Sequence, residues 1–532
     1  MTSTRRSFLK RSAGLGMAYV LPWSPVLAQD SEIAPLMTWI PHADLSVVDP
    51  LFSTSMITQI FAAQVFDTLF GLRDDFTVSL QMAKSHTVSD DGLTHEMTLR
   101  EGMKFHNGAD VTAQDVAASI LRWTSRASLA SGLKDVMEEI IATDSATVII
   151  SLRKPYPLLP DLLARPQNAC VIVPAEQAAS GVRLERPVGS GPYRMVWDEW
   201  VQGARVVFER FEDYQPRPSD HPAEFTAGAK IARVERIEWH IVPDAATAVT
   251  AMQTGEVDGL ETVSQDFVPI LRAFPEVTLQ TNSVPTIPIM RFNQLQAPFN
   301  DAGLRRAILP AISQSSFMNA IGATPDNPAF DMATGAFAPD SAMANDKGLE
   351  ALTGPRDIEG ARQAIAKAGY AGTEIVVVDV VSSPLLHACA LVGADLLTKL
   401  GFSVKLEAMD WGAALQKRED KSPVTEGGWS VMFTALIGIN TFDPIGNLGL
   451  RATGADGWFG WPESERLESL RDAWMQAESQ AERIEIAGQI QQQMFEDVPY
   501  IPLGSIFTTT AMTNKWNGLS RYMPMFYGLN AT

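Results

Sequence analysis

The strongest constraint on the fold lies in residues 374–407, where two strand patterns flank one helix pattern. A run rich in β-branched residues covers positions 374–381. A helical stretch at 385–400 follows and ends at Gly401, after which apolar and polar residues alternate over 402–407. A strand, a long helix and a second strand make a βαβ unit, whose two strands lie parallel in one sheet. The sequence therefore predicts an α/β fold with helices on the faces of a parallel sheet.

The length of the chain indicates more than one domain. With 532 residues it exceeds what a single hydrophobic core usually serves, so two or three domains are expected. After the N-terminal segment no run of eighteen apolar residues occurs, so no membrane-spanning helix is predicted.

The first 28 residues have the layout of a cleaved export signal. Arg5 and Arg6 precede a modestly apolar stretch at 13–27, and Ala28 ends a small-residue cleavage motif. The paired arginines resemble a twin-arginine signal, which is an address and not an anchor, with an ordinary secretory signal as the alternative. We expect the mature chain to begin near Gln29. Because no cysteine follows the apolar stretch, a lipid anchor is not expected, and the protein should be free in the periplasm.

The balance of charges excludes several classes of partner. The chain carries 42 basic and 62 acidic residues, a formal net charge of −20. The export segment contains four basic residues and no acidic ones, so its removal lowers the formal charge to −24. A protein this acidic is a poor candidate for binding nucleic acid or an anionic membrane surface.

The sequence offers little that indicates catalysis or metal binding. None of the seven histidines stands at a metal-ligand spacing such as H-E-x-x-H, and there is no G-x-S-x-G turn or phosphate loop. We therefore expect no catalytic residue, metal or cofactor. The cysteines Cys170 and Cys389 lie far apart, which favours two buried thiols over a disulfide.

A second informative stretch is residues 88–123, where turn, strand and helix signals follow in tight succession. Positions 94–100 alternate between apolar and polar residues, as expected of a half-buried strand. Thr112 stands three residues before Asp115, the spacing of a capping box at a helix start. The sequence thus predicts a strand closely followed by a capped helix.

This stretch also closely resembles a signature of the family 5 extracellular solute-binding proteins, the receptors of peptide, nickel and opine ABC importers. It contains the S-D-D-G turn, the L-R-x-G-x-x-F-H-x-G run and the T-A-x-D-V helix start of that signature. Residues 188–193 are close to a second family marker, V-G-T-G-P-Y. The resemblance implies an α/β, two-lobed periplasmic binding protein fold with an additional subdomain in the first lobe. The implied limits are a signal at 1–28, a first lobe at 29–284 with the subdomain at about 75–220, a second lobe at 285–499 and a return to the first lobe at 500–532.

The resemblance also implies a function. The protein is expected to be the periplasmic substrate-binding subunit of an ABC importer, a monomer that encloses a peptide or peptide-like solute between its lobes and delivers it to a permease in the inner membrane. No nucleic acid partner is implied. The alternatives are a periplasmic hydrolase and a binding receptor for a chemosensory partner.

Three segments supply the candidate ligand contacts. The loop at 52–55 faces the ligand in relatives, although its Ser and Thr residues are equally explained by a helix start. The segment 433–447 ends near an Asp-Pro pair around which relatives place contacts, and the glycine-rich loop at 457–462 is unusually aromatic. With two further polar and aromatic positions, the candidates are Ser53, Thr54, Ser55, His387, Trp411, Asn440, Asp443, Trp458, Phe459 and Trp461.

One departure from the family pattern bears on the ligand. Dipeptide-binding relatives hold the ligand's amino group with an aspartate shortly before the Asp-Pro pair, and its carboxylate with an arginine in the βαβ unit. Here residues 433–442 contain no acid and residues 382–391 contain no arginine. Burying a charged terminus without a partner costs several kcal/mol. We therefore expect a longer peptide held mainly through its backbone, or a less charged solute, with His387 or Asn440 as replacement polar contacts.

Overall fold

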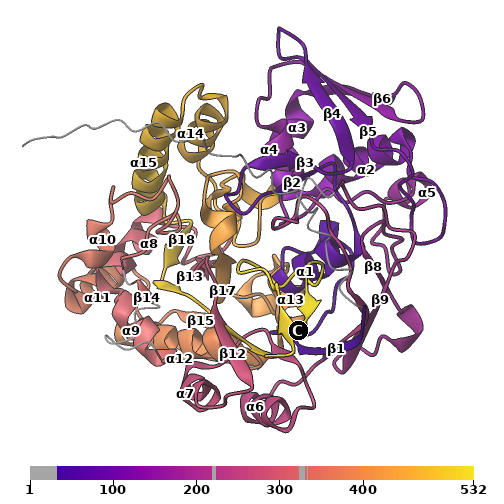
Figure 1. Cartoon of the computed structure of the whole chain (residues 1–532). Coiled ribbons are helices and arrows are strands. Elements are labelled where there is room, and N and C mark those ends of the chain that lie inside the picture. Colours follow the sequence, from indigo (N-terminus) through magenta and orange to yellow (C-terminus); the bar gives the residue numbers. More distant parts are fainter. Residues whose placement is uncertain (1–32, 219–222, 323–329, 332) are drawn as a thin grey trace, which may run out of the picture.

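The computed structural model describes residues 33–218, 223–322, 330–331 and 333–532. The predicted export signal at residues 1–28 lies outside these ranges. The described chain forms two lobes, each built around a seven-stranded sheet (Figure 1). Lobe II runs from β13 to β19, residues 286–506, and lobe I consists of the described residues before and after it.

The main sheet of lobe I has the strand order β12-β20-β11-β1-β10-β9-β8. Strand β1 is parallel to β10 and β11, whereas the other neighbours are antiparallel. The strands are β1 (Ala34–Ile40), β8 (Tyr193–Met195), β9 (Arg205–Arg210), β10 (Val234–His240), β11 (Gly259–Leu260), β12 (Val277–Thr281) and β20 (Thr509–Thr513).

An additional sheet stands on lobe I, as predicted, at the upper right of Figure 1. It comprises β4 (Ala83–Val88), β5 (Thr94–Leu99), β6 (Met137–Ala142) and β7 (Thr147–Leu152), with α2 (Ala113–Arg126) in contact with β6 and β7. Strand β5 and the capping box of Thr112 and Asp115 confirm the predictions for this stretch. The predicted subdomain limit near 220 is too late, because β8 and β9 belong to the main sheet of lobe I.

The sheet of lobe II has the order β14-β19-β13-β17-β15-β16, with β18 also paired to β13. Its βαβ unit is confirmed, since β15 and β16 are parallel and α12 packs on the sheet between them. A Cβ at Gly393 of α12 would lie 2.1 Å from the Phe433 ring, so a glycine is needed for this close packing. The elements are β13 (Thr286–Phe292), β14 (Phe330–Asp331), β15 (Glu374–Val380), α12 (Pro384–Lys399), β16 (Ser403–Met409), β17 (Val431–Ile437), β18 (Tyr500–Pro502) and β19 (Ser505–Ile506).

Two neighbouring segments connect the lobes, at residues 282–285 and 507–508. The backbone N–H of Asn282 donates to the carbonyl of Thr508 at 2.9 Å, and their side chains are hydrogen bonded at 2.7 Å. The predicted return to lobe I at residue 500 is too early, because β18 and β19 pair with β13 of lobe II. Two connections held side by side form a hinge about which the lobes can move.

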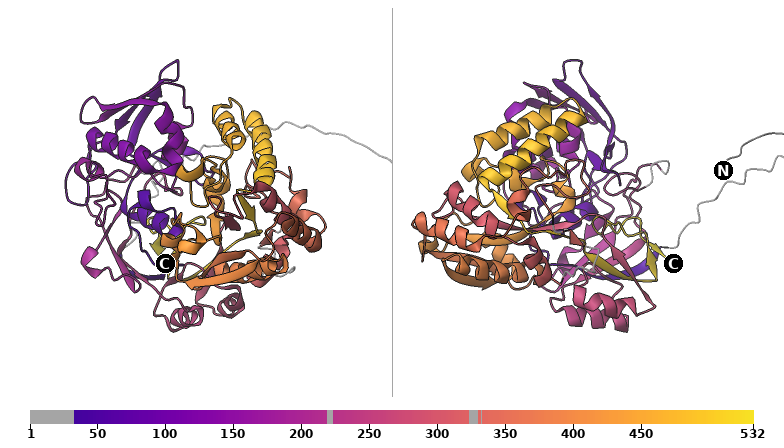
Figure 2. Two further views of the ribbon diagram at one scale, coloured as in Figure 1. Left: turned by 180° about the vertical axis from the view of Figure 1, so that it is seen from behind. Right: turned by 90° about the vertical axis from the view of Figure 1, so that its left-hand side faces the viewer.

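The remaining helices and strands cover the sheets and connect them (Figures 1 and 2). They are α1 (Met56–Val65), β2 (Phe70–Leu72), β3 (Val78–Leu80), α3 (Ser131–Val136), α4 (Leu159–Leu163), α5 (Ala175–Ala178), α6 (Ala245–Thr254), α7 (Val268–Arg272), α8 (Ala302–Ile308), α9 (Gln314–Ala320), α10 (Glu350–Thr353), α11 (Ile358–Lys367), α13 (Trp411–Lys417), α14 (Glu465–Gln476), α15 (Gln480–Asp497), β21 (Trp516–Asn517) and β22 (Asn530–Ala531). Among the described residues, no helix combines the length and apolar character that a membrane span requires.

Both cysteines are buried and unpaired, as the sequence favours. Cys170 lies in lobe I and Cys389 on α12 of lobe II. Burial raises the pKa of Cys389 to about 12 and that of Cys170 further still, because a buried thiolate loses its hydration. The two thiols are therefore packing groups, one in each lobe.

Candidate ligand-binding region between the lobes

The loop that leads into α1 is fastened to lobe I by a buried ion pair. Asp49 caps the short turn η1 (Pro50–Phe52) by accepting the N–H of Leu51 at 3.2 Å. Arg122 of α2 donates to both oxygens of the Asp49 carboxylate, at 2.5 and 3.3 Å. The N–H of Leu184 donates to the same carboxylate at 2.9 Å. Residues 53–55 are thereby held in one position at the side of lobe I that meets lobe II.

Within this loop the three predicted contacts have different surroundings. Ser53 and Ser55 are buried, with their hydroxyls 2.8 Å apart, and Ser55 also lies 2.9 Å from the hydroxyl of Thr58. These bonds are local to the start of α1. Thr54 is half-buried, and its hydroxyl accepts the indole N–H of Trp458 in lobe II at 3.4 Å. Thr54 is therefore the member of the trio that reaches across to the second lobe.

The aromatic residues of the loop at 457–462 in lobe II also have different surroundings. Phe459 and Trp461 are 1% and 2% exposed, and Trp461 packs against Trp429 with ring centroids 5.9 Å apart. Trp458 covers Phe459 at 4.2 Å, and its N–H points to Thr54. Phe459 and Trp461 thus pack within lobe II, while Trp458 lies where the lobes meet.

Sequence reasoning did not single out Arg291, which supports Trp458 from behind. Arg291 is fully buried on β13, with its guanidinium carbon 4.9 Å from the Trp458 ring. It donates to the carbonyls of Phe459 at 2.8 Å, Gly449 at 2.8 Å and Pro499 at 3.0 Å. Burial lowers its pKa to about 9. This cation joins three separate segments of lobe II beneath the indole.

Asp443 is held by contacts on both of its oxygens. One accepts the N–H groups of Ile445 and Gly446 at 2.9 and 3.0 Å. The other forms an ion pair with Arg165 of lobe I, and the two side chains are only 14% and 10% exposed. The preceding residue, Phe442, packs edge-on against Phe76 of lobe I, with centroids 4.7 Å apart. Arg165 and Phe76 carried no signal in the sequence, since each meets its partner only through the tertiary fold.

The remaining candidates lie at the ends of the lobe II strands. Asn440, in the turn η7 (Gly438–Thr441) after β17, is 2% exposed. A hydrogen bond of 2.7 Å joins Nδ1 of His387 and the carboxyl group of the buried Asp379. Trp411 begins α13 after β16, and its backbone N–H donates to the Ser382 hydroxyl at 2.9 Å. These positions follow the carboxyl ends of β15, β16 and β17, the edge where open α/β sheets bind their ligands.

This edge of lobe II approaches a loop of lobe I. Burial raises the pKa of Asp44, which follows β1, and the charge of Asp410 in lobe II adds to the effect. Asp410 in turn caps α13 by accepting the N–H of Ala413 at 3.1 Å. The loop after β1 and the start of α13 therefore lie near one another across the boundary.

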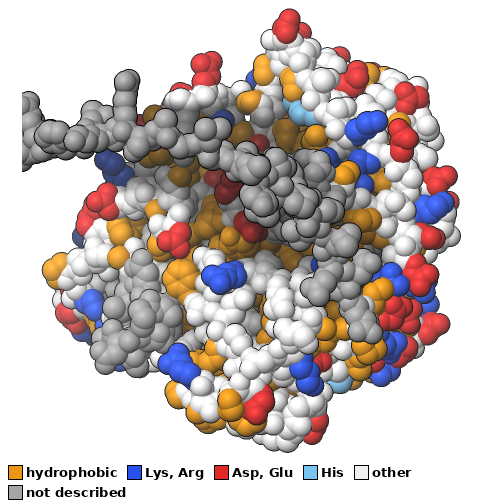
Figure 3. Space-filling model, in the orientation of Figure 1, with side chains coloured by type: hydrophobic (Ala, Val, Ile, Leu, Met, Phe, Trp, Pro, Cys, Tyr) orange, Lys and Arg blue, Asp and Glu red, His pale blue; other side chains and the backbone are white. Residues whose placement is uncertain are grey.

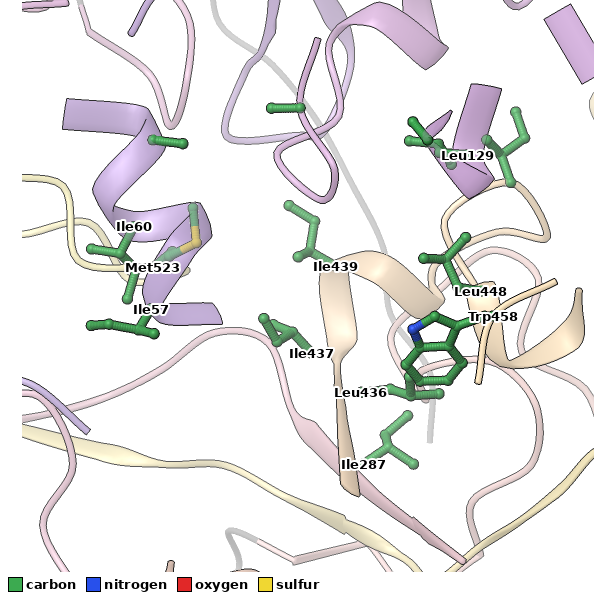
Figure 4. Close-up of a cluster of buried hydrophobic side chains, with 14 of the residues drawn as sticks. Ile57, Ile60, Leu129, Ile287, Leu436, Ile437, Ile439, Leu448, Trp458 and Met523 are labelled. Atoms are coloured by element: carbon green, nitrogen blue, oxygen red, sulfur yellow. The ribbon is translucent and has the colours of Figure 1, made fainter. Parts of the chain in front are cut away.

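Apolar side chains from both lobes line the same region. Figure 3 shows the described surface hollowed between α14 and α15 on one side and the additional sheet on the other, with hydrophobic and some acidic side chains inside. Figure 4 shows Ile57, Ile60, Leu129 and Met523 of lobe I with Ile287, Leu436, Ile437, Ile439, Leu448 and Trp458 of lobe II. We call this set the interlobe apolar cluster. All ten side chains are buried, so in this structure the apolar groups of the two lobes pack together at the boundary.

Several of the charged groups near this boundary lie in pairs, whereas Asp44 and Asp410 have no cationic partner among the described residues. A small hollow beside α1 is lined by Gln59, Arg165 and Lys230, among others, and Lys230 contacts Asp67 at 2.8 Å with both side chains 2% exposed. Other pairs are Arg122 with Asp49, Arg165 with Asp443, His42 with Glu261 and His387 with Asp379. No group of three His, Cys, Asp or Glu side chains that could hold a metal ion occurs among the described residues.

Comparison with known families agrees with this architecture. The model of the bacterial extracellular solute-binding proteins, family 5, matches residues 77–457. The chain belongs to this family. Both the resemblance seen in the sequence and the two-lobed α/β fold are confirmed, and the family supports the predicted role of a substrate-binding subunit.

Two similar proteins align with this chain over more residues than the family model does. The probable peptide ABC transporter periplasmic-binding protein y4tO of Sinorhizobium fredii is 32% identical over 529 residues, which are 98% of this chain and 97% of that protein. The glutathione-binding protein GsiB of Salmonella typhi is 26% identical over 427 residues, 79% of this chain and 78% of that protein.

Solved structures share the fold at lower identity. The periplasmic binding protein DppA from Helicobacter pylori, in complex with the peptide STSA, has a TM-score of 0.79 at 20% identity and covers 94% of this chain and 98% of its own. The binding protein AgaA from A. tumefaciens, in complex with agropinic acid, has a TM-score of 0.78 at 22% identity, with coverages of 93% and 99%.

Proposed function

We propose that this protein captures a peptide or peptide-like solute between its two lobes and delivers it to an ABC permease. Membership of the solute-binding family and the long match to a relative named as a peptide ABC transporter protein support this role. Proteins of the same fold hold ligands as different as the peptide STSA and agropinic acid, so the fold leaves the ligand open. The hinge at residues 282–285 and 507–508 provides the motion that capture needs.

The pairing of charges at the boundary carries the proposal on ligand class. The cationic side chains named at the boundary are already bonded within the protein, whereas Asp44 and Asp410 have no cationic partner among the described residues. A ligand whose carboxylate was buried here would meet no free cation, which costs several kcal/mol. The proposed ligand is therefore an apolar peptide or peptide-like solute whose carboxylate stays in water or is absent.

The proposed contacts come from both lobes. Thr54 and Trp458 meet across the boundary, with Ser53 and Ser55 beside Thr54, and Asn440, His387 and Trp411 follow the strands of lobe II. Asp443, Phe459 and Trp461 remain predictions, which alanine substitution tests one at a time. For Trp461, unchanged affinity in Trp461→Ala would assign the side chain to the core alone.

The remaining parts of the proposal concern place and partners. The protein is exported to the periplasm by the twin-arginine-type signal, acts as a monomer without catalytic turnover and docks on the permease after closure. Replacement of Arg5 and Arg6 by lysine tests the signal, because continued export through the same route would contradict it.

The test uses the exported protein and a panel of neutral apolar peptides of three to six residues. Each peptide is offered in zwitterionic form and with both ends capped, and binding is followed by thermal shift and tryptophan fluorescence. We expect responses that survive capping. No response to any peptide would contradict the proposal, and a strict need for both free ends would contradict the ligand class. Mass spectrometry of the recovered peptides distinguishes binding from hydrolysis, and loss of uptake on gene deletion distinguishes import from chemosensing.

A further inference from the structure

We propose that Phe76 and Arg165 of lobe I are positioning residues that hold the lobes together by gripping two consecutive residues of lobe II, Phe442 and Asp443. The four side chains form what we call the interlobe clasp. It requires only the two-lobed fold and does not depend on which solute the protein binds.

The ion pair is the first half of the interlobe clasp. Arg165 follows α4 in lobe I, while Asp443 follows η7 in lobe II, and the pair is almost withdrawn from water. The second oxygen of Asp443 is occupied by the N–H groups of Ile445 and Gly446, so the carboxylate is oriented toward Arg165 before the lobes meet. Removing one partner of a largely desolvated pair leaves the other charge uncompensated, so it opposes closure more than the loss of an exposed surface pair would.

The aromatic contact is the second half. The ring of Phe442 meets that of Phe76 at an interplanar angle of 85°, a favourable edge-to-face arrangement. Phe76 also contacts Tyr522 at 5.0 Å and Phe225 at 6.1 Å, both in lobe I. Phe442 therefore joins an aromatic group that lobe I supplies ready-made.

The backbone conformation of Phe76 is unfavourable for a phenylalanine, which indicates that the contacts of its ring stabilise this turn. The residue lies in the turn between β2 and β3 with φ at 62°, in the left-handed region that favours glycine or asparagine. A phenylalanine there carries backbone strain, which persists where other contacts offset it. The turn itself is already closed by the N–H of Phe76, which donates to the carbonyl of Arg73, and by the N–H of Thr77, which donates to the Asp75 carboxylate. The ring contacts with Phe442 and the lobe I aromatics supply the offset.

The interlobe clasp acts on the ligand through position alone. Phe442 and Asp443 directly follow η7, which carries Asn440, and β17, which carries Ile437. Gripping the two residues fixes this part of lobe II against lobe I. The interlobe clasp should therefore raise the population of the closed form and slow solute release for every ligand by the same factor.

The experiment measures lobe closure in the exported protein without added solute. Single-molecule fluorescence transfer between one dye on each lobe gives the closed fraction. We expect Arg165→Met and Asp443→Asn each to lower the ratio of closed to open molecules about tenfold, and the double variant to lower it no further because the pair is already broken. Asparagine keeps the oxygen that accepts from Ile445 and Gly446.

Phe76→Gly tests the aromatic half independently, because it removes the ring and relieves the strained φ. It should open the lobes while changing the melting temperature little, because the relieved strain offsets the lost contacts with Tyr522 and Phe225. Arg210→Met is the matched control, since its partner Glu235 lies within lobe I at 3.1 Å, and it should leave closure unchanged. A wild-type protein that is already open, or unchanged closure in the three folded variants, would overturn the proposal. Failure to bind peptides would leave this result unaffected.

Discussion

The indole N–H of Trp458 and the hydroxyl of Thr54 form a hydrogen bond that joins residues 404 positions apart, one in each lobe, over 3.4 Å. The two groups reach this arrangement because each is supported from its own side. Arg291 lies beneath the indole, and the ion pair of Arg122 with Asp49 holds the loop of Thr54. The hydrogen bond therefore forms only when the two lobes have this relative position.

Trp458→Phe should weaken solute binding about fivefold, because it keeps the aromatic surface and removes a hydrogen bond worth roughly 1 kcal/mol. Thr54→Val should have the same effect, and the double variant should be no weaker than either single one. Calorimetric titration with a peptide that the wild-type protein binds checks this expectation. Additive losses in the double variant would show that the two side chains act separately.

Arg291→Met should destabilise the protein by about 3 kcal/mol, because it leaves buried carbonyls of Phe459, Gly449 and Pro499 without a donor. Urea unfolding followed by circular dichroism measures this loss. Arg210→Met, at a partly exposed pair, provides the comparison and should cost less than 1 kcal/mol. An equal loss in the two variants would contradict the assigned role of Arg291.

Acid should destabilise the fold through the stacked pair of His86 and His95, whose ring nitrogens lie 3.0 Å apart. Burial lowers the pKa of His95 to about 4, and His86 adds to the effect. Because an unfolded histidine titrates near 6.5, the unfolded chain binds more protons between pH 6.5 and 4. The free energy of unfolding should fall by on the order of 2 kcal/mol as the pH drops through this window. His95→Gln should flatten the slope, and an unchanged slope would contradict the assignment.

Both thiols should be unreactive in the folded protein. Cys170 and Cys389 are buried, and the raised pKa of each thiol leaves almost no thiolate at neutral pH. A colorimetric thiol reagent should therefore detect no thiol in native buffer and two per chain in 6 M guanidinium. Detection of none after unfolding would indicate a disulfide and contradict the structure.

Local patterns were sufficient for the elements that depend on neighbours in the chain. The βαβ unit of lobe II and the capped helix after Thr112 were predicted because strand alternation, helix length and capping are set within a few residues. The end of lobe II was placed too early, at residue 500, for the opposite reason. An apolar strand such as β18 carries no sign of which sheet it will join, and here it pairs with β13.

In the candidate site, too, local sequence identified some residues but not their tertiary contacts. Trp458 and Trp461 stand three positions apart in one aromatic loop, and nothing in that loop tells them apart. In the fold, Trp461 packs against Trp429, whereas Trp458 meets Thr54. Similarly, the sequence drew attention to Asp443, but its partner Arg165 lies 278 residues away.

By itself, the sequence determined the family, the α/β class and the supply of side chains at the boundary, because these depend on residue type and local spacing. Only the tertiary structure decided which of those side chains meet across the lobes. Contacts such as Arg165 with Asp443 and Phe76 with Phe442 arise when two separately built sheets are brought together at a hinge. That geometry is a property of the whole packed chain, which no local pattern encodes.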